Sequence, residues 1–160
     1  MNSDARCPNP AATWPQRANS LMVQTYLAHS FDIRVYYEDT DAGGIVYHGS
    51  HVRFLERGRT EFLRSIGLDQ SVLMSADRGK PLLFVVRRME LDYIKPARLD
   101  DLLTVTTELK ELGGARLVLE QRLMRDIDMI LTGRVTVAAI SSDGRPMRIP
   151  SDIRKRFLGA

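Results

Sequence analysis

Hydrophobic and polar residues alternate in five segments of the chain, and in one other segment the hydrophobic residues recur at helical spacing. Strict alternation predicts strands with one buried face. The alternating segments are residues 31–37, 82–94, 102–112, 116–124 and 129–140. The apolar face of the first predicted strand carries Phe31, Ile33, Val35 and Tyr37.

The strand predicted over residues 82–94 has one irregular position. Its odd-numbered residues are apolar apart from Arg87, and we expect them to share one face of the sheet. Arg87 could reach a subunit interface or a substrate phosphate, but the more ordinary expectation is that its aliphatic stem runs along apolar surface while its charged end reaches solvent. The apolar residues of this face are Leu83, Val85, Met89, Leu91 and Tyr93.

Residues 50–66 form the predicted helix, because their hydrophobic side chains recur every three or four positions. Gly58, in the middle of this helix, costs roughly 1 kcal/mol relative to alanine. We therefore expect the helix backbone to press closely onto the sheet at this turn. Gly67 is expected to end the helix. The hydrophobic positions are Phe54, Leu55, Phe62, Leu63 and Ile66.

Turn residues separate the later elements. Gly113-Gly114 is expected to supply the positive φ angles of a tight hairpin. A second turn is predicted over residues 142–144, which read Ser-Asp-Gly. Ser151 is expected to cap a short final helix that ends near residue 158.

One long helix and five strands predict an α+β fold, in which a curved antiparallel five-stranded sheet wraps around one central helix. A sheet with a second bare face and open edges favours pairing between copies of the chain. Residues 1–28 contain three prolines and no sustained period, which predicts a flexible N-terminal extension. The folded domain is expected to comprise residues 29–160.

Charge and composition limit the classes of partner. The net charge is +3, and basic and acidic residues are interspersed, so no block is typical of a nucleic-acid-binding arm. No apolar run reaches the roughly 20 residues of a membrane-spanning helix. Cys7 is the only cysteine, which fits a reducing compartment. We expect a cytoplasmic protein with no nucleic-acid partner and no membrane span.

The junction between the first strand and the helix concentrates the candidate chemistry. It runs from Tyr36 to His48 and reads YYEDTDAGGIVYH. Asp41 supplies a carboxylate, and Gly43 and Gly44 allow a sharp turn and the close approach of a ligand. The first amides of the following helix have no intrahelical partners and carry a partial positive charge. A carboxylate, an imidazole and free amides can meet here, which predicts an active site.

Each of these residues also has an ordinary structural explanation. An aspartate before a helix is often a cap or a turn former, and Asp39 is a rival carboxylate two positions away. His48 and His51, with Asp41 or Glu56, have a spacing that a metal site tolerates, but we expect no metal. Glu56 is expected to pair with an arginine on the helix surface rather than act in catalysis.

Short motifs at fixed spacing extend from the junction into the helix. They are Arg34-Val35, Thr40-Asp41, Gly44-Ile45-Val46, His48, Phe54-Leu55-Glu56-Arg57 and Arg59-Thr60-Glu61. With the predicted architecture, they resemble the hotdog-fold acyl-CoA thioesterases of the 4-hydroxybenzoyl-CoA thioesterase family. The most similar branch is the one found beside the Tol-Pal cell-envelope system of Gram-negative bacteria. The resemblance covers about residues 31–157.

This resemblance implies thioester hydrolysis without a metal or organic cofactor, in homodimers or homotetramers with sites between subunits. In the family the aspartate at the position of Asp41 is essential, and the position of His48 lies in the active site. Asp41 can attack the thioester as a nucleophile or activate a water as a general base. The amides at the helix start would form the oxyanion hole. Gly44, Tyr47 and Tyr37 are expected to contact the substrate.

Other functions and several substrates stay open. A hydroxyacyl-thioester dehydratase shares the hotdog fold, but its His-containing motif is absent from this sequence. A binding partner of acyl carrier protein or of envelope assembly would keep the fold with little turnover. The substrate is expected to be an acyl-CoA or an acyl-carrier-protein thioester, and short-chain and hydroxybenzoyl-type acyl groups both fit the motif. The resemblance to the Tol-Pal branch suggests aliphatic acyl groups and a link to phospholipid metabolism. Candidates for contacting coenzyme A phosphates are Lys95, Arg98, Arg116 and Arg145.

Overall fold

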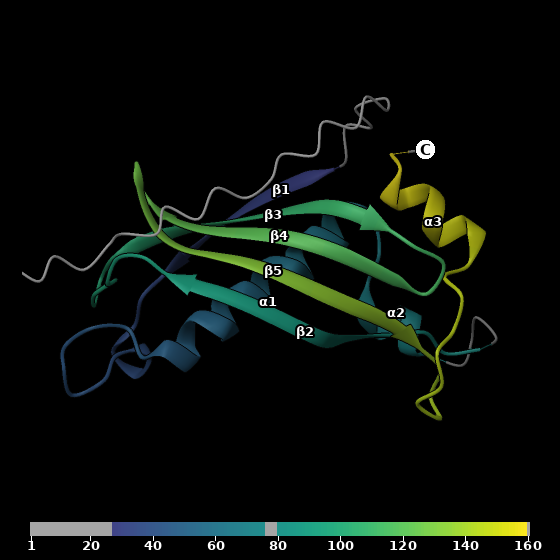
Figure 1. Cartoon of the computed structure of the whole chain (residues 1–160), viewed down its shortest axis with the longest axis horizontal. Coiled ribbons are helices and arrows are strands. Elements are labelled where there is room, and N and C mark those ends of the chain that lie inside the picture. The colour runs from purple at the N-terminus through teal and green to yellow at the C-terminus, as the bar shows by residue number, and fades with distance from the viewer. Residues whose placement is uncertain (1–26, 76–79, 160) are drawn as a thin grey trace, which may run out of the picture.

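A computed structural model describes residues 27–75 and 80–159 of the chain. It contains one five-stranded antiparallel sheet in the order β1-β3-β4-β5-β2. The long helix α1 (His48–Ser65) covers one face of this sheet (Figure 1). This is the α+β architecture predicted from the sequence. The strands are β1 (Ala28–Arg34), β2 (Leu83–Tyr93), β3 (Leu102–Leu112), β4 (Arg116–Arg125) and β5 (Asp128–Ile140).

Within the described residues, three shorter helical segments lie outside the sheet: η1 (Tyr37–Asp39), α2 (Gln70–Met74) and α3 (Ser151–Phe157). Helix α2 was not predicted, because its five residues are too few to show a period. Helix α3 follows Pro150, and Ser151 is its first residue and makes no capping bond, so the predicted cap is wrong. The predicted N-terminal extension lies almost wholly outside the described residues.

The core lies between α1 and the inner face of the sheet. Strand β3 keeps the predicted alternation throughout, and β4 and β5 keep it apart from Val118 and Ile130, which are buried next to inward residues. Burial of these apolar side chains is the main term that holds the helix on the sheet. The inward residues include Leu103, Val105, Leu109, Leu117, Leu119, Leu123, Leu131, Val135 and Val137.

Gly58 marks the closest approach of α1 to the sheet. A Cβ atom at this position would clash with Cγ1 of Val105 and lie 3.3 Å from Oγ1 of Thr107. Both residues belong to β3, which runs beneath the middle of the helix. The predicted close packing at Gly58 is therefore confirmed.

A buried polar network fixes α1 at the same level. Arg59 is 8% exposed, and its Nη1 donates to Oε1 of Gln121 at 2.8 Å. The Nε2 of Gln121 donates to the backbone oxygen of Leu55 at 2.9 Å and to Oγ1 of Thr107 at 2.8 Å. One side chain of β4 thus holds two turns of the helix and the neighbouring strand together.

A β-bulge in β2 changes which residues face inward. The register of β2 against β5 shifts between Val86 and Arg88, which makes Arg87 the extra residue. Before the bulge, Phe84 and Val86 pair with buried residues of β5, whereas after it the odd-numbered Met89 does so. The prediction that odd positions share one face along the whole strand is therefore wrong before the bulge, and Arg87 is exposed.

Of the four glycines predicted to end a helix or form a turn, two have a left-handed backbone conformation and two do not. Gly67 follows α1 with φ of 73°, and its amide donates to the oxygen of Arg64 at 2.8 Å, as expected of a helix end. Gly144 has φ of 80° in the turn after β5. Neither Gly113 nor Gly114 has a left-handed φ, so the predicted hairpin geometry is wrong.

Candidate active site

The first strand ends at Arg34, earlier than the sequence pattern predicts. The chain turns here because the amide of Tyr36 donates to Oδ2 of Asp39 at 3.0 Å, and the amide of Asp39 donates back to the oxygen of Tyr36 at 3.0 Å. Tyr37 lies in this turn and is 81% exposed. Its predicted place on the buried face of the strand is wrong.

Asp39 is the buried carboxylate of the junction, with 2% of its surface exposed. Besides the amide of Tyr36, it has Nη2 of Arg53 at 3.8 Å from its Oδ1. Its backbone oxygen accepts the amide of Tyr47 at 2.8 Å. Asp39 therefore shapes the turn and has no access to a substrate in solvent.

Asp41 is exposed and occupies a tight loop of its own. Its Oδ1 accepts the amide of Gly43 at 2.8 Å, and its backbone oxygen accepts the amide of Gly44 at 3.0 Å. Gly44 has φ of 71°, a conformation that favours glycine. Within residues 27–75 and 80–159, Oδ2 of Asp41 has no hydrogen-bond donor. The carboxylate is thus oriented through one oxygen and open to solvent through the other.

The start of α1 lies beside this loop. Thr40 and Val46 form an isolated bridge, and the amide of Val46 donates to the oxygen of Ala97 at 2.8 Å. These bonds close the loop that carries Asp41 and lead the chain directly into the helix. Helix α1 then begins at His48.

The first turn of α1 keeps its amides available. It contains no acidic residue, and no side chain caps it. The amide of Ser50 is the first to be used, since it donates to the oxygen of Tyr47 at 2.8 Å. The amides of His48 and Gly49 have no partner within the part of the chain that the structure describes. Two adjacent free N–H groups at a helix start form the kind of donor pair that an oxyanion requires.

The aromatic side chains around this turn form a small cluster. Tyr47 is 46% exposed, and its ring lies 4.2 Å from that of the exposed His48. His51 is only 4% exposed, and its Nδ1 lies 3.2 Å from the oxygen of Tyr47. Burial lowers the pKa of His51 below its ordinary value.

Tyr93 completes the cluster from β2. Its ring meets that of His51 edge-on at 5.3 Å, and its hydroxyl donates to the backbone oxygen of His48 at 3.2 Å. The sequence pattern indicated only an apolar strand residue at this position. Its hydrogen bond to the helix start joins residues 45 positions apart, which no local pattern reveals.

The geometry of the acidic and histidine side chains bears on two alternatives, a metal site and a helix-surface role for Glu56. Among residues 27–75 and 80–159, no three His, Cys, Asp or Glu side chains gather as metal ligands would. Oε1 of Glu56 accepts the hydroxyl of Thr60 at 2.9 Å. Burial lowers the pKa of Arg59 and the charge of Glu56 opposes this shift, so Glu56 acts on an arginine of the helix as expected, through its charge and not through a hydrogen bond.

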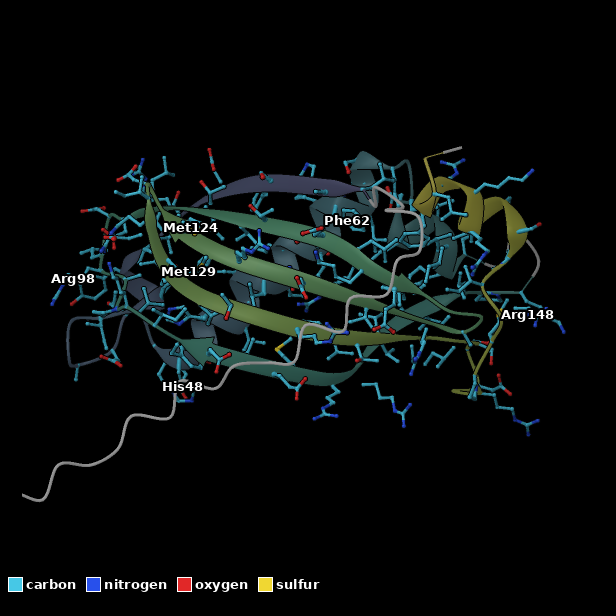
Figure 2. All side chains as sticks on the ribbon, turned by 45° about the horizontal axis from the view of Figure 1, so that its top comes forward. His48, Phe62, Arg98, Met124, Met129 and Arg148 are labelled. Atoms are coloured by element: carbon cyan, nitrogen blue, oxygen red, sulfur yellow. The ribbon has the colours of Figure 1, made fainter. Side chains whose placement is uncertain are left out.

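Three of the four basic candidates for a phosphate contact are already paired. Arg98 has no ion pair within the described ranges, and it lies at the same end of the molecule as His48 (Figure 2). Arg148 lies at the opposite end (Figure 2). The paired candidates are Lys95 with Asp128, Arg116 with Glu111 and Arg145 with Asp143.

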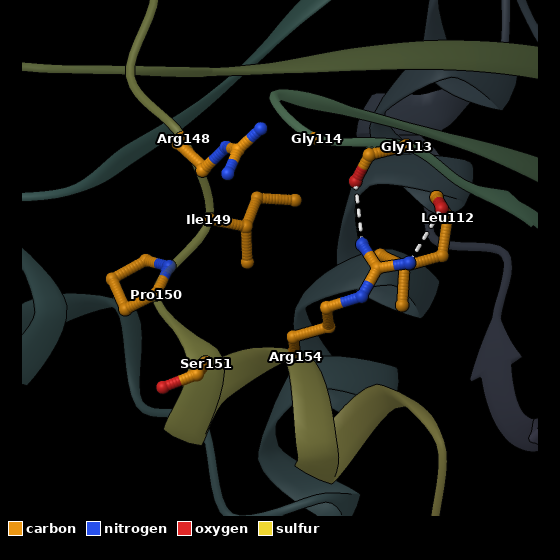
Figure 3. Close-up of a pocket in the computed structure, with 8 residues that line it drawn as sticks. All are labelled: Leu112, Gly113, Gly114, Arg148, Ile149, Pro150, Ser151 and Arg154. Atoms are coloured by element: carbon orange, nitrogen blue, oxygen red, sulfur yellow. Dashed lines mark hydrogen bonds between the residues drawn. The ribbon is translucent and has the colours of Figure 1, made fainter.

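Two hollows in the surface lie apart from the Asp41 loop. One is a groove of about 690 Å³ beside α3, where Arg154 donates to the backbone oxygens of Leu112 and Gly113 (Figure 3). The other is a pocket of about 100 Å³ between α1 and β2, lined in part by Phe84 and Val86. Neither is lined by Asp41 or His48. Asp41 and His48 are both exposed on the surface of the single chain.

Residues 43–132, which include the helix start and most of the sheet, match the family model described as "Thioesterase superfamily". The chain belongs to this superfamily. The match begins inside the Asp41 loop and ends in β5. The predicted hotdog thioesterase fold is thereby confirmed.

Relatives of this superfamily member extend the match. The chain is 44% identical over 129 residues to "Acyl-CoA thioesterase YbgC" of Haemophilus influenzae, which covers 80% of this chain and 93% of the relative. It is 44% identical over 128 residues to "Acyl-CoA thioester hydrolase YbgC" of Escherichia coli O6:H1, covering 78% and 92%. The predicted likeness to acyl-CoA thioesterases is confirmed.

Solved structures agree with these relatives. "Probable Thioesterase from Bartonella henselae" superposes with a TM-score of 0.75 at 44% identity, covering 78% of this chain and all of that one. A hypothetical protein of Thermus thermophilus superposes with a TM-score of 0.74 at 28% identity, covering 80% and 95%. None of the helices in residues 27–75 and 80–159 has the length and apolar character that crossing a membrane requires.

Proposed function

We propose that this member of the thioesterase superfamily hydrolyses acyl-CoA thioesters, with Asp41 as the catalytic carboxylate. Two observations support the proposal: an exposed, oriented carboxylate in the loop that leads into α1, and two unpaired amides at the start of this helix. The names of the two 44% identical relatives support the same reaction.

In the proposed reaction the thioester oxygen accepts hydrogen bonds from the amides of His48 and Gly49. The carbonyl carbon then faces the open oxygen of Asp41. Attack by Asp41 gives a tetrahedral intermediate that collapses to a mixed anhydride as the C–S bond breaks, and water hydrolyses the anhydride. Alternatively Asp41 removes a proton from a water, which attacks the same carbon. Both routes yield a carboxylic acid and coenzyme A.

His48 is proposed to transfer the proton that the departing coenzyme A thiolate takes up. Its imidazole is exposed and lies one residue after the exposed Tyr47, against whose ring it packs. An imidazole at this position can protonate the departing thiolate or orient the attacking water. Tyr47, Gly44 and Tyr37 are exposed members of the junction that carries Asp41 and are proposed to contact the substrate.

We also propose that the active form is a homodimer or a homotetramer. The Asp41 loop is open in one chain, and β2 is an edge strand that exposes the apolar Val85 and Val86. Exposed apolar edge strands favour pairing between chains. Light scattering coupled to gel filtration measures the mass in solution. A fully active monomer at micromolar concentration would overturn this part of the proposal.

The substrate is proposed to be an acyl-CoA or an acyl-carrier-protein thioester, with an aliphatic acyl group and a link to the Tol-Pal system and phospholipid metabolism. The resemblance to the Tol-Pal-associated branch supports this choice of substrate and this cellular link. The single Cys7 and the coenzyme A substrate support a cytoplasmic location. Fractionation of cells that express the full chain tests the location directly.

The deciding experiment measures free-thiol release from short, long and aromatic acyl-CoAs by the wild type and by Asp41→Asn. This substitution keeps the size of the side chain and removes its charge. We expect turnover to fall by a factor of about 10³ or more, which corresponds to about 4 kcal/mol of barrier. Equal rates in both proteins would overturn the role of Asp41. Binding of acyl-CoA with no turnover in either protein would instead favour the binding-partner function.

A further inference from the structure

We propose that His51 and Tyr93 are positioning residues of the oxyanion hole, each holding one of its two peptide units through the carbonyl side. The proposal rests on the proposed function, because it concerns the same two amides of His48 and Gly49. It adds two side chains that do not themselves touch the substrate.

The first peptide unit joins Tyr47 to His48. Its N–H is the free amide of His48, and its oxygen lies 3.2 Å from Nδ1 of His51. A carbonyl oxygen only accepts hydrogen bonds, so Nδ1 carries the proton and donates. The donor to the substrate and the oxygen that accepts from His51 thus belong to one planar group.

The second peptide unit joins His48 to Gly49. Its N–H is the free amide of Gly49, and its oxygen accepts the hydroxyl of Tyr93 at 3.2 Å. The hydrogen bonds at 3.2 Å from the two side chains thus go to consecutive peptide units, and the imidazole of His51 also interacts with the backbone of His48. Both amides proposed to bind the oxyanion are supported in the same way.

The two supports also hold each other. The rings of His51 and Tyr93 meet edge-on at 5.3 Å with an interplanar angle of 88°, and the other side of His51 faces Phe54 at 6.2 Å. His51 is 4% exposed, so its ring has little freedom to turn. Because Tyr93 belongs to β2, its bond ties the helix start to the sheet rather than to the helix alone.

Two physical effects follow for the oxyanion. A hydrogen bond to the oxygen of a peptide group polarises the group and strengthens its N–H as a donor, by about 10–30% per bond. The bonds also fix the direction of both N–H vectors before the substrate binds, and preorganised donors stabilise the transition state more than the ground state. Loss of either support is therefore expected to reduce kcat more than it changes KM.

The kinetic test uses thiol release from butyryl-CoA and benzoyl-CoA by variants of the full chain. Tyr93→Phe removes only the hydroxyl, and His51→Leu removes the ring donor. Loss of one direct oxyanion donor costs about 10²–10³ in kcat, so we expect roughly a tenfold loss for each indirect support, with KM within about twofold. His51→Asn, which keeps an N–H near the position of Nδ1, should recover most of the lost kcat.

Tyr36→Phe is the matched control, because it removes a hydroxyl from a tyrosine that is 62% exposed in the same loop. It should leave kcat unchanged. Wild-type kcat in either Tyr93→Phe or His51→Leu would overturn the proposal. So would a change confined to KM, or equal losses in His51→Leu and His51→Asn.

A spectroscopic measurement separates positioning from a general effect on folding. In the Asp41→Asn background, the carbonyl stretch of bound ¹³C-labelled butyryl-CoA should shift to lower frequency than in free butyryl-CoA. Adding Tyr93→Phe should reverse part of this shift, and an unaltered shift would overturn the proposal. If the wild type releases no thiol, the proposed function fails together with this inference. If the wild type releases thiol and Tyr93→Phe has the same kcat, only this inference fails.

Discussion

Asp39 and Asp41 lie two residues apart in one loop, yet their carboxylates have opposite surroundings. Asp39 is 2% exposed and accepts the amide of Tyr36, whereas Asp41 is exposed and leaves Oδ2 open. A buried carboxylate bonded to backbone amides shapes the chain, and an exposed one can meet a substrate. The structure therefore separates two residues that the sequence presents as rivals.

Replacing Asp39 by asparagine should affect stability, whereas the same replacement of Asp41 should affect turnover. Asp39→Asn weakens a charge-assisted bond at a buried site, so we expect a loss of about 1–3 kcal/mol in the free energy of unfolding. Asp41→Asn should change that free energy by less than about 0.5 kcal/mol while abolishing thiol release. Urea unfolding and thiol release measure the two effects. If Asp39→Asn retained full stability and lost turnover, Asp39 would be the essential acid.

Arg98 is expected to contribute to the binding of coenzyme A. It follows Ala97, which accepts the amide of Val46 in the active-site loop, and its side chain forms no ion pair in the described ranges. Arg98→Ala should raise KM for acyl-CoA about three- to tenfold, the effect of one hydrogen bond worth about 0.5–1.5 kcal/mol, with kcat nearly unchanged. Arg122→Ala, on the exposed side of β4, is the control and should leave both parameters unchanged. An unchanged KM in Arg98→Ala would exclude this role.

Gly58→Ala tests the close packing of the helix on β3. Alanine gains roughly 1 kcal/mol of helix propensity, but its Cβ would clash with Val105, and overpacking typically costs about 1–3 kcal/mol. We expect a net loss of unfolding free energy, measured by urea denaturation. The double variant Gly58→Ala with Val105→Ala should lose less unfolding free energy than the two single variants lose in sum. Simple additivity would show that the clash is not the cause.

The stability of the protein should depend on the protonation of His51. Burial lowers its pKa in the folded state below the ordinary value of 6.5, so the unfolded chain binds the proton more readily. Stability from the neutral ring is present above pH 6.5 and is lost as the pH falls below it. The wild type should therefore lose unfolding free energy relative to His51→Phe between pH 7.5 and 5. A constant difference across this range would contradict the prediction.

Most of the sheet could be predicted because its strands have one buried face and one exposed face. Residues 102–112, 116–124 and 129–140 alternate in the sequence, and the structure forms strands over nearly the same ranges. The helix was also predicted from its one buried face, because its hydrophobic residues recur every three or four positions. The extra residue at Arg87 was not predictable, because a bulge reverses the alternation without leaving a turn residue in the sequence.

The candidate site was predictable only in part. Asp41 and His48 stand out by type and position, and the structure places both on one exposed loop and helix start. Tyr37 was misplaced, because the side chain of Asp39 ends the strand through a bond that alternation does not reveal. His51 and Tyr93 were missed as partners, because their contact depends on where β2 crosses the start of α1.

The attachment of α1 through Gln121 limits how the length of the chain can change. Moving the helix by one turn, about 5.4 Å, would separate Gln121 from both Leu55 and Arg59. An insertion between Asp41 and His48 therefore cannot be absorbed by sliding the helix, and it must distort the loop that holds the carboxylate. An insertion after Gly67, beyond the end of α1, has no such consequence. Variation in length should thus be tolerated after the helix and not before it.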